Sequence, residues 1–384
     1  MNTKIIKLTL SGSVIFFILN FISGVDFGAF ERDYFEAHSL GMDHLHSSGN
    51  IFQLIQTIPN SASGVLPLWF YGITKSIYLR KIISLVIVFL ITYVIASKTK
   101  LDNFGRYFIY SLLISPMIIS SATWVLPEIF ALLMVVIYFS LSQIHWLILF
   151  IVGFCIPLSR QTFIIFSPLS LISRSAYDLK TIILYGLPPT LGLALVYLIW
   201  GGLVPPRLRK VHYTPSILAP IYALLIISLY TFYYHCKYFI SNRFDLRKFL
   251  LSSIISGVII AISFLCQPVL GGGYIFSRLQ EASTIGFCII TYVLLSSLLY
   301  SARKKAVFIF LIMSLSFITT NYMFLKYIDI YMFCFLATGL TIYNSETTDI
   351  LYEDYAKSTL IFELISYLVS SLYYYQIVEK MIAL

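Results

Sequence analysis

Long apolar runs recur from one end of this chain to the other, and they restrict its possible folds more than any other feature. A helix needs roughly 20 apolar residues to cross the hydrocarbon of a bilayer, and it must satisfy its own backbone hydrogen bonds there. The runs therefore predict an all-α integral membrane protein with about 11 to 13 transmembrane helices. We expect spans near residues 8–24, 81–97, 107–121, 127–142, 145–158, 162–173, 181–200, 216–236, 249–267, 284–302, 306–322, 327–343 and 359–378.

Two of these runs, 145–158 and 162–173, are short for a span and are typical of a broken or re-entrant pair. The first run follows Lys4 and Lys7, as the apolar part of a signal peptide would. No small-x-small cleavage site comes after it, so we expect a retained first span. Together the runs predict a single polytopic membrane domain over 1–384, with an external loop at 25–80 and the remaining bundle at 81–384.

The distribution of Lys and Arg predicts which side of the membrane each connection occupies. The chain is 59% hydrophobic and 11% charged, and its formal net charge is +9. Basic residues gather in the connections KTKLDNFGR, SRSAYDLK, CKYFISNRFDLRK and SARKK, while 344–358 is an acidic connection on the same side. The positive-inside rule then places these connections and the N-terminus in the cytoplasm. We attribute the positive charge to this bias and expect no nucleic-acid partner.

The segment from Gly24 to Gly64 departs sharply from the apolar background. It contains five acids, three histidines and several aromatic residues that alternate with the acids: Asp26, Glu31, Asp33, Glu36, Asp43, His38, His44, His46, Phe27, Phe30, Tyr34 and Phe35. Interleaved aromatics are not typical of a plain solvated linker, so we expect an acidic catalytic loop folded back onto the helices. After it, Pro59, Gly64 and Pro67 divide 50–80 into short pieces, which favours amphipathic helices lying along the interface.

Several basic residues fall on the expected external side, where they are rare. They are Arg160, Arg207, Arg209, Lys210, Arg278 and Lys326. Charges near the membrane are costly and are often retained for ion or substrate contacts, so we expect some of these groups to touch an anionic substrate. The alternative is that they pair with the loop acids or with lipid headgroups. The triple glycine before Tyr274 and Arg278 allows close approach of a phosphate or sugar.

Other classes of protein lack support in the sequence. There is no GKS/T phosphate loop, HExxH or GxSxG motif, which argues against an ATP-driven pump, a common zinc protease and an ordinary serine hydrolase. His38, His44 and His46 beside Asp43 could bind a divalent metal, but the His-Leu-His spacing separates two of the side chains on a helix. We therefore expect no cofactor, with a divalent metal as the alternative.

The order of these features resembles the GT-C superfamily, membrane glycosyltransferases that use polyprenyl- or dolichyl-phosphate sugars. The likeness is closest to the endoplasmic-reticulum alpha-1,2-glucosyltransferases and to bacterial relatives of the mannosyltransferase type. It rests on Asp33 in RDYFEAHSL, on SASGVLPLWFYGI, on the tripeptide Arg160-Gln161-Thr162 and on WGGLVPPRLRKVH, and it covers the first half of the chain. The family often has paired adjacent acids, whereas here Tyr34 follows Asp33.

This resemblance implies a GT-C-like fold and a glycosyl transfer that inverts the sugar. Such a reaction needs a carboxylate to take the acceptor proton, cations to stabilise the departing phosphate, and exclusion of water. Asp33 is the expected base, or alternatively the partner of Arg32 or another loop cation in a salt bridge, with Glu36 or Glu31 as the second acid. The expected contacts to lipid phosphate and sugar are Arg160, Gln161, Arg207, Arg209, Lys210, His212, Tyr274 and Arg278. Arg160 could instead tie broken helices to a loop acid.

The expected activity is transfer of a sugar from a polyprenyl-phosphate donor to a cell-surface polysaccharide or lipid-linked acceptor. We expect the enzyme in a bacterial inner membrane, with its active site facing the periplasm. Two alternatives stay open. An O-antigen or capsule polymerase also depends on external arginines, but usually has large later periplasmic loops. A lipid-linked sugar flippase or transporter would favour charges inside the spans and two-fold internal symmetry, whereas the expected spans are nearly free of charge, with Glu363 as the plain exception, and show no such symmetry.

Overall fold

The chain folds into α-helices. The computed structural model describes residues 3–27, 31, 34–35, 39, 42–43, 64–141, 145–174, 178–202, 216–264, 279, 281–317, 325–341 and 350–382. Within these ranges the secondary structure is helical and contains no strand, which confirms the predicted all-α class. The chain forms two compact units, Met1–Arg207 with Leu336–Leu384, and Leu208–Phe335. The prediction of one polytopic domain over 1–384 stays a prediction.

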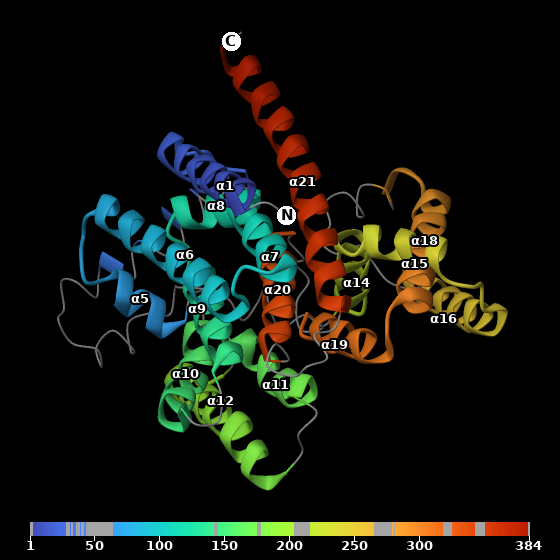
Figure 1. Ribbon diagram of the computed structural model, residues 1–384, viewed down its shortest axis with the longest axis horizontal. Coiled ribbons are helices and arrows are strands. Elements are labelled where there is room, and N and C mark those ends of the chain that lie inside the picture. The colour runs from blue at the N-terminus through green and yellow to red at the C-terminus, as the bar shows by residue number, and fades with distance from the viewer. Residues whose placement is uncertain are drawn as a thin grey trace. The chain divides into compact units, whose positions relative to one another are not determined.

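The first unit is a bundle whose long helices pack in pairs (Figure 1). Helix α7 lies against α21, α6 lies against α9, and α10 lies between α9 and α12. The elements of this unit are α1 (Thr3–Ser23), α5 (Val65–Tyr71), α6 (Ile77–Thr99), α7 (Asn103–Ile114), α8 (Pro116–Thr123), α9 (Pro127–Ser140), α10 (Trp146–Ser159), η3 (Gln161–Ile165), α11 (Phe166–Arg174), α12 (Leu179–Trp200), η5 (Gly339–Thr341) and α21 (Ile350–Ile382). Helix α21 therefore begins inside the 344–358 segment that was expected to be a loop, and that expectation is wrong from Ile350 onward.

Prolines and glycines determine how α10 and α12 pack. Pro189 has no N–H to donate to the carbonyl of Tyr185, one turn earlier in α12. That carbonyl accepts hydrogen bonds from Tyr138 Oη at 2.6 Å and from Ser167 Oγ at 2.8 Å instead. A Cβ added to Gly192 would lie 2.2 Å from the Phe154 carbonyl oxygen, so α12 approaches α10 too closely for any side chain there. Close contact through small residues is typical of helices packed in a membrane.

The second unit contains α14 (Leu218–Tyr230), α15 (Phe232–Ser241), α16 (Leu246–Phe264), α18 (Thr284–Ser301), α19 (Lys304–Leu315) and most of α20 (Leu325–Thr338). Its polar contacts join these helices internally. Tyr230 Oη donates to Asp329 Oδ1 at 2.8 Å, and both residues are buried. His235 is buried between the hydroxyls of Thr231 and Ser301. These bonds satisfy polar groups that would otherwise be costly in an apolar interior.

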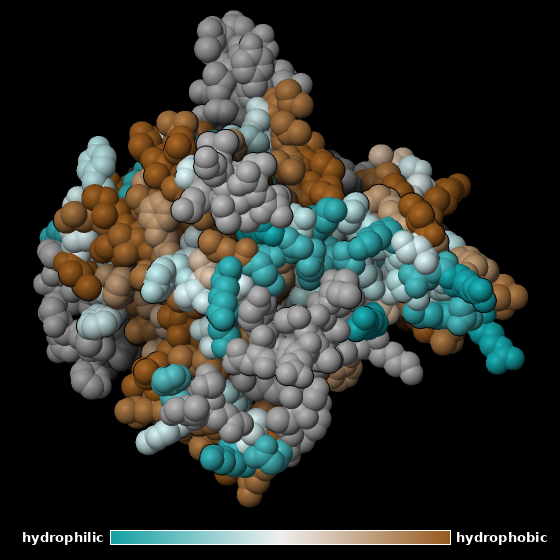
Figure 2. Space-filling view, in the orientation of Figure 1, coloured by the Kyte–Doolittle hydropathy of each residue, from teal (hydrophilic) through white to brown (hydrophobic). Residues whose placement is uncertain are grey.

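The helices are those of a multi-pass membrane protein. In the described ranges four helices are long and apolar enough to cross a membrane: α6, α12, the 246–263 part of α16, and α18. The bent pairs α8 with α9 (115°) and α14 with α15 (62°) raise the number to six if each pair is one span. Many exposed side chains on these helices are apolar, such as Leu198 (78% exposed) and Ile285 (74%), and brown side chains cover much of the face in Figure 2.

Two expected spans are interrupted. The run at 107–121 is divided into α7 and α8 because Pro116 begins a new helix, which Ser115 caps by accepting the Ile118 N–H. The run at 216–236 bends at Thr231. The expected pair at 145–158 and 162–173 corresponds to α10 and to η3 with α11, separated by extended backbone at Arg160.

Candidate functional site

The predicted site residues divide into those that the structure describes and those that it does not. Glu31, Arg160 and Gln161 are described, and all three belong to the first unit. Arg32 and the three loop histidines His38, His44 and His46 lie outside the described ranges. So do the other predicted site residues, which are Asp33, Glu36, Arg207, Arg209, Lys210, His212, Tyr274 and Arg278. The roles predicted for them stay predictions.

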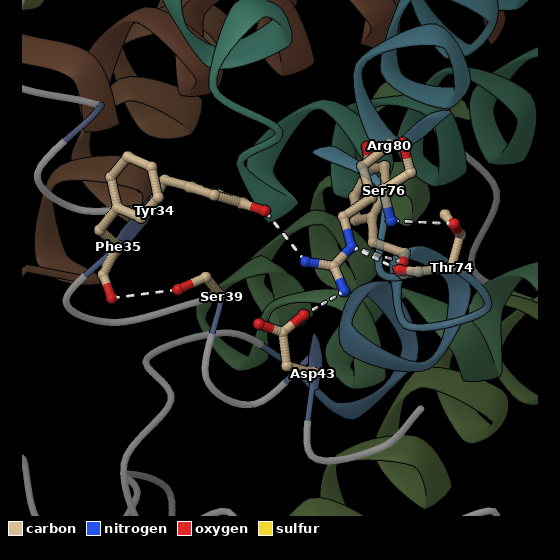
Figure 3. Close-up of polar contacts among 8 residues, drawn as sticks. Tyr34, Phe35, Ser39, Asp43, Thr74, Ser76 and Arg80 are labelled. Carbon is tan, nitrogen blue, oxygen red and sulfur yellow. Dashed lines mark hydrogen bonds and ion pairs between the residues drawn. The ribbon is translucent and has the colours of Figure 1, made fainter. Parts of the chain in front are cut away.

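Arg80, in the first turn of α6, connects the acidic loop to the bundle (Figure 3). Its Nε donates to the carbonyls of Tyr71 (3.0 Å) and Thr74 (2.8 Å), which close the turn between α5 and α6. Its Nη1 donates to Tyr34 Oη at 3.0 Å, and its Nη2 contacts Asp43 Oδ1 at 2.7 Å. The guanidinium therefore fixes two loop residues and the preceding turn at once.

The burial of Arg80 explains why it needs these partners. Its side chain is 1% exposed, whereas that of Asp43 is 51% exposed. A buried charge is tolerated when it is paired and its donors are all used, and guanidinium offers donors in a fixed planar fork. Arg80 is thus the buried member of the pair, and about half of the Asp43 side chain is exposed.

A second cation, Lys81, lies beside Arg80. Its Nζ is 4.3 Å from the centroid of the Trp124 ring, a distance at which the ring attracts a cation. Phe35 of the loop packs against the same ring, with centroids 6.4 Å apart. The negative charge of Glu31 interacts electrostatically with the Lys81 ammonium group. The backbone N–H of Glu31 donates a hydrogen bond to Asp26 Oδ2 at 3.0 Å. One of the three predicted catalytic acids therefore lies near a cation of the bundle.

Arg160 forms an ion pair with Glu128. Glu128 is in the first turn of α9, where the helix dipole favours an acid, and Arg160 follows the end of α10. This geometry matches the predicted alternative in which Arg160 ties broken helices to an acid, although the acid is Glu128 rather than one from the long loop. Gly64 packs directly on the same helix end: a Cβ there would lie 2.1 Å from the Leu158 carbonyl oxygen.

Several residues beside these charged clusters carry buried polar groups. Tyr71 is fully buried, with Ser84 beside its hydroxyl, and burial together with the nearby Glu128 raises the pKa of the phenol well above its usual value. Tyr71 is therefore a neutral group at any physiological pH. Trp124 Nε1 and Gln161 Oε1 are also buried and have no hydrogen-bond partner among the described residues. Such groups are typical of places where water or a ligand supplies the missing partner.

Sequence reasoning missed Arg80, Lys81, Tyr71 and Trp124. The available signal was the dipeptide Arg80-Lys81 at the start of a long apolar run, where two cations at membrane depth deserve a functional or structural explanation. The two loop partners of Arg80, Asp43 and Tyr34, are 37 and 46 residues away in the chain, so no local pattern identifies them. Val125, next to Trp124, has a φ of 58°, which is strained for a β-branched residue and accompanies the sharp bend between α8 and α9.

In the parts of the chain that the structure describes, no three His, Cys, Asp or Glu side chains gather as a metal site requires. The three loop histidines lie outside those parts, so the metal alternative stays untested. Comparisons with family models, with characterised proteins and with solved structures found no match to this chain.

Proposed function

We propose that this protein is a membrane glycosyltransferase that moves a sugar from a polyprenyl-phosphate donor to a cell-surface polysaccharide or lipid-linked acceptor. The observation that carries the proposal is the attachment of the acidic loop to the bundle. Arg80 holds Tyr34 and Asp43, and Lys81 lies near Glu31. Acids and cations therefore meet over apolar helices, which is the combination that transfer from a lipid phosphate requires.

In this proposal Asp33 takes the proton of the acceptor hydroxyl, with Glu36 or Glu31 as the second acid. Tyr34, the neighbour of Asp33 in the chain, is hydrogen-bonded to Arg80, which supports a fixed backbone next to the base. The cations Arg207, Arg209, Lys210 and Arg278, with His212 and Tyr274, would hold the phosphate and the sugar. Arg160 and Gln161 would act from the end of α10, where Gln161 Oε1 has unused hydrogen-bonding capacity.

The finer fold assignment belongs to the same proposal. A GT-C-like bundle of about 11 to 13 spans requires several short helices to cross the membrane in pieces or at a tilt. Apolar helices of suitable composition are present at 9–23, 146–159, 161–172, 306–315 and 328–341. We place the protein in a bacterial inner membrane, with the N-terminus in the cytoplasm, the amphipathic 50–80 segment at the interface and the loop in the periplasm.

One observation favours a transporter of lipid-linked sugars as a second candidate. Asp329 and Glu363 are both fully buried, in α20 and α21 respectively. Acids inside apolar helices often mark ion or proton paths. However, Asp329 accepts a hydrogen bond from Tyr230, which is sufficient reason for its burial without transport.

The proposal is tested by comparing Asp33→Asn with Asp43→Asn in the purified full-length protein. The assay supplies a radiolabelled polyprenyl-phosphate sugar and extracted cell lipids as acceptor. We expect Asp33→Asn to lose at least about a hundredfold in rate, the usual contribution of a positioned base. Asp43→Asn can still accept the Arg80 hydrogen bond, so it should stay within about tenfold of the wild type.

Two results would contradict the proposal. Equal losses in the two variants would mean that Asp33 has no special role in the chemistry. A wild-type protein that ignores the monophosphate donor but extends lipid-diphosphate repeat units would instead be an O-antigen or capsule polymerase.

A further inference from the structure

Three helix ends meet in the second unit around one aromatic residue. Tyr300, at the end of α18, stacks on Phe239 of α15 with ring centroids 4.8 Å apart, and it also packs against Phe249 of α16 at 6.2 Å. Its hydroxyl accepts the backbone N–H of Asp245, in the turn between α15 and α16, at 2.9 Å. This cluster fixes the turn against the end of α18.

The same three helix ends are candidate span ends. Helix α15 completes the bent apolar pair at Ser241, the span in α16 begins at Leu246, and the span of α18 ends at Ser301. Where spans begin and end together, the chain is at the level of the lipid headgroups. The aromatic cluster around Tyr300 also has the composition of an interfacial belt.

Basic residues surround this cluster. Lys248 Nζ lies 5.3 Å and 5.5 Å from the ring centroids of Tyr238 and Tyr300. Arg243 and Arg247 are exposed, and neither takes part in the ion pairs found among the described residues. Lys237, within α15, and Arg303, directly before α19, are also exposed. The acid among these residues is Asp245, and its carboxylate accepts the backbone N–H of Lys248 at 3.1 Å.

Large apolar side chains are exposed between the cations. Ile240 is 87% exposed, Phe244 61% and Leu246 60%. Side chains of this kind rarely gather on a surface that faces water alone. A surface with guanidinium groups beside exposed aromatic and aliphatic groups suits a lipid, whose phosphate meets the cations while its acyl chains meet the apolar groups.

We propose that this surface, formed by Lys237, Ile240, Arg243, Phe244, Arg247 and Lys248, binds the headgroup of an anionic phospholipid. Arg243 and Arg247 hold the phosphate, and the Tyr300 cluster keeps the turn that carries them in place. Basic clusters directly next to spanning helices attract anionic lipids at about 1 kcal/mol for each Lys or Arg. This inference does not depend on the proposed glycosyl transfer.

The test uses the full-length protein in detergent, titrated with phosphatidylglycerol or phosphatidylcholine, with bound lipids counted by native mass spectrometry. We expect the wild type to bind phosphatidylglycerol more tightly than phosphatidylcholine. The double variant Arg243→Gln with Arg247→Gln should weaken the tightest phosphatidylglycerol binding about 30-fold, the equivalent of two basic residues. Inorganic phosphate in millimolar excess should displace little of the lipid.

The matched control is Lys100→Gln with Lys180→Gln, which removes two exposed charges at span ends of the first unit. It should leave phosphatidylglycerol binding within about twofold of the wild type. Equal weakening in both double variants would show that net charge alone attracts the lipid, and would overturn the proposal. A wild type without preference for phosphatidylglycerol, or full displacement by inorganic phosphate, would also overturn it.

Discussion

At the scale of single residues, the account depends on Arg80. One guanidinium uses three nitrogens to hold Tyr71, Thr74, Tyr34 and Asp43. A lysine at this position could not reproduce the planar arrangement of donors. The residue therefore acts by ordering the loop and the α5–α6 turn, and it is distinct from Lys81, whose charge lies over Trp124.

This role predicts a large effect of Arg80→Met, which keeps the apolar stem and removes the donors. We expect the free energy of unfolding to fall by about 3 kcal/mol, because the Tyr71 and Thr74 carbonyls and the buried Tyr34 hydroxyl lose a charged partner. The measurement is denaturant unfolding in detergent, followed by tryptophan fluorescence. Arg247→Met is the control, because Arg247 is exposed, and should change stability by no more than about 0.5 kcal/mol. Similar stabilities for the two variants would refute the ordering role.

At the scale of helices, close packing of α10 on α12 supports the end of α10 that carries Arg160. The carbonyl freed by Pro189 is satisfied from two neighbouring elements, and Gly192 lets the helix backbones touch. At the C-terminal end of α10, Leu158 and Ser159 contact Gly64, and the following residue, Arg160, pairs with Glu128. The position of the predicted Arg160-Gln161 pair is therefore a consequence of helix packing.

Two glycines of α12 provide a direct test of this packing. Gly192→Ala places a methyl group 2.2 Å from the Phe154 carbonyl oxygen, so we expect a loss of about 1–3 kcal/mol of stability through overpacking. Gly186→Ala meets nothing within 4 Å in the same helix, and should gain about 0.5–1 kcal/mol from the better helix former. Thermal unfolding of both variants in one detergent gives the comparison. A loss in both, or a gain in both, would contradict the close approach of α10 and α12.

Much of the helical structure could be predicted from the sequence because hydropathy is a local property. The spans expected near 81–97, 181–200 and 284–302 correspond to α6, α12 and α18. The breaks at Ser115 and Thr231 were missed because Pro116 and Thr231 stand inside apolar runs. Hydropathy gives the length of an apolar segment but not whether the helix bends within it. Arg80 was missed because its loop partners, Tyr34 and Asp43, come from a distant segment, and the pairing of Arg160 with Glu128 joins residues 32 positions apart.

At the scale of the whole molecule, the described residues combine apolar helices that can cross a membrane with a polar region in each compact unit. The first unit holds the acidic loop, Arg80, Lys81 and the Arg160–Glu128 pair. The second holds the basic and aromatic surface around Tyr300. We propose that the acids of the reaction belong to the first region, and that the surface around Tyr300 contacts lipid, so each proposal can fail without the other.

The most direct test of the central claim is the choice of donor by the wild-type protein. The full-length chain, in nanodiscs, is supplied with a sugar labelled on a polyprenyl monophosphate and, separately, with a labelled lipid-diphosphate repeat unit. The account predicts that label leaves the monophosphate donor and enters a lipid or polysaccharide acceptor, with one polyprenyl phosphate released for each sugar transferred. Extension of the diphosphate-linked unit alone, or movement of an intact donor across sealed vesicles without transfer, would contradict it.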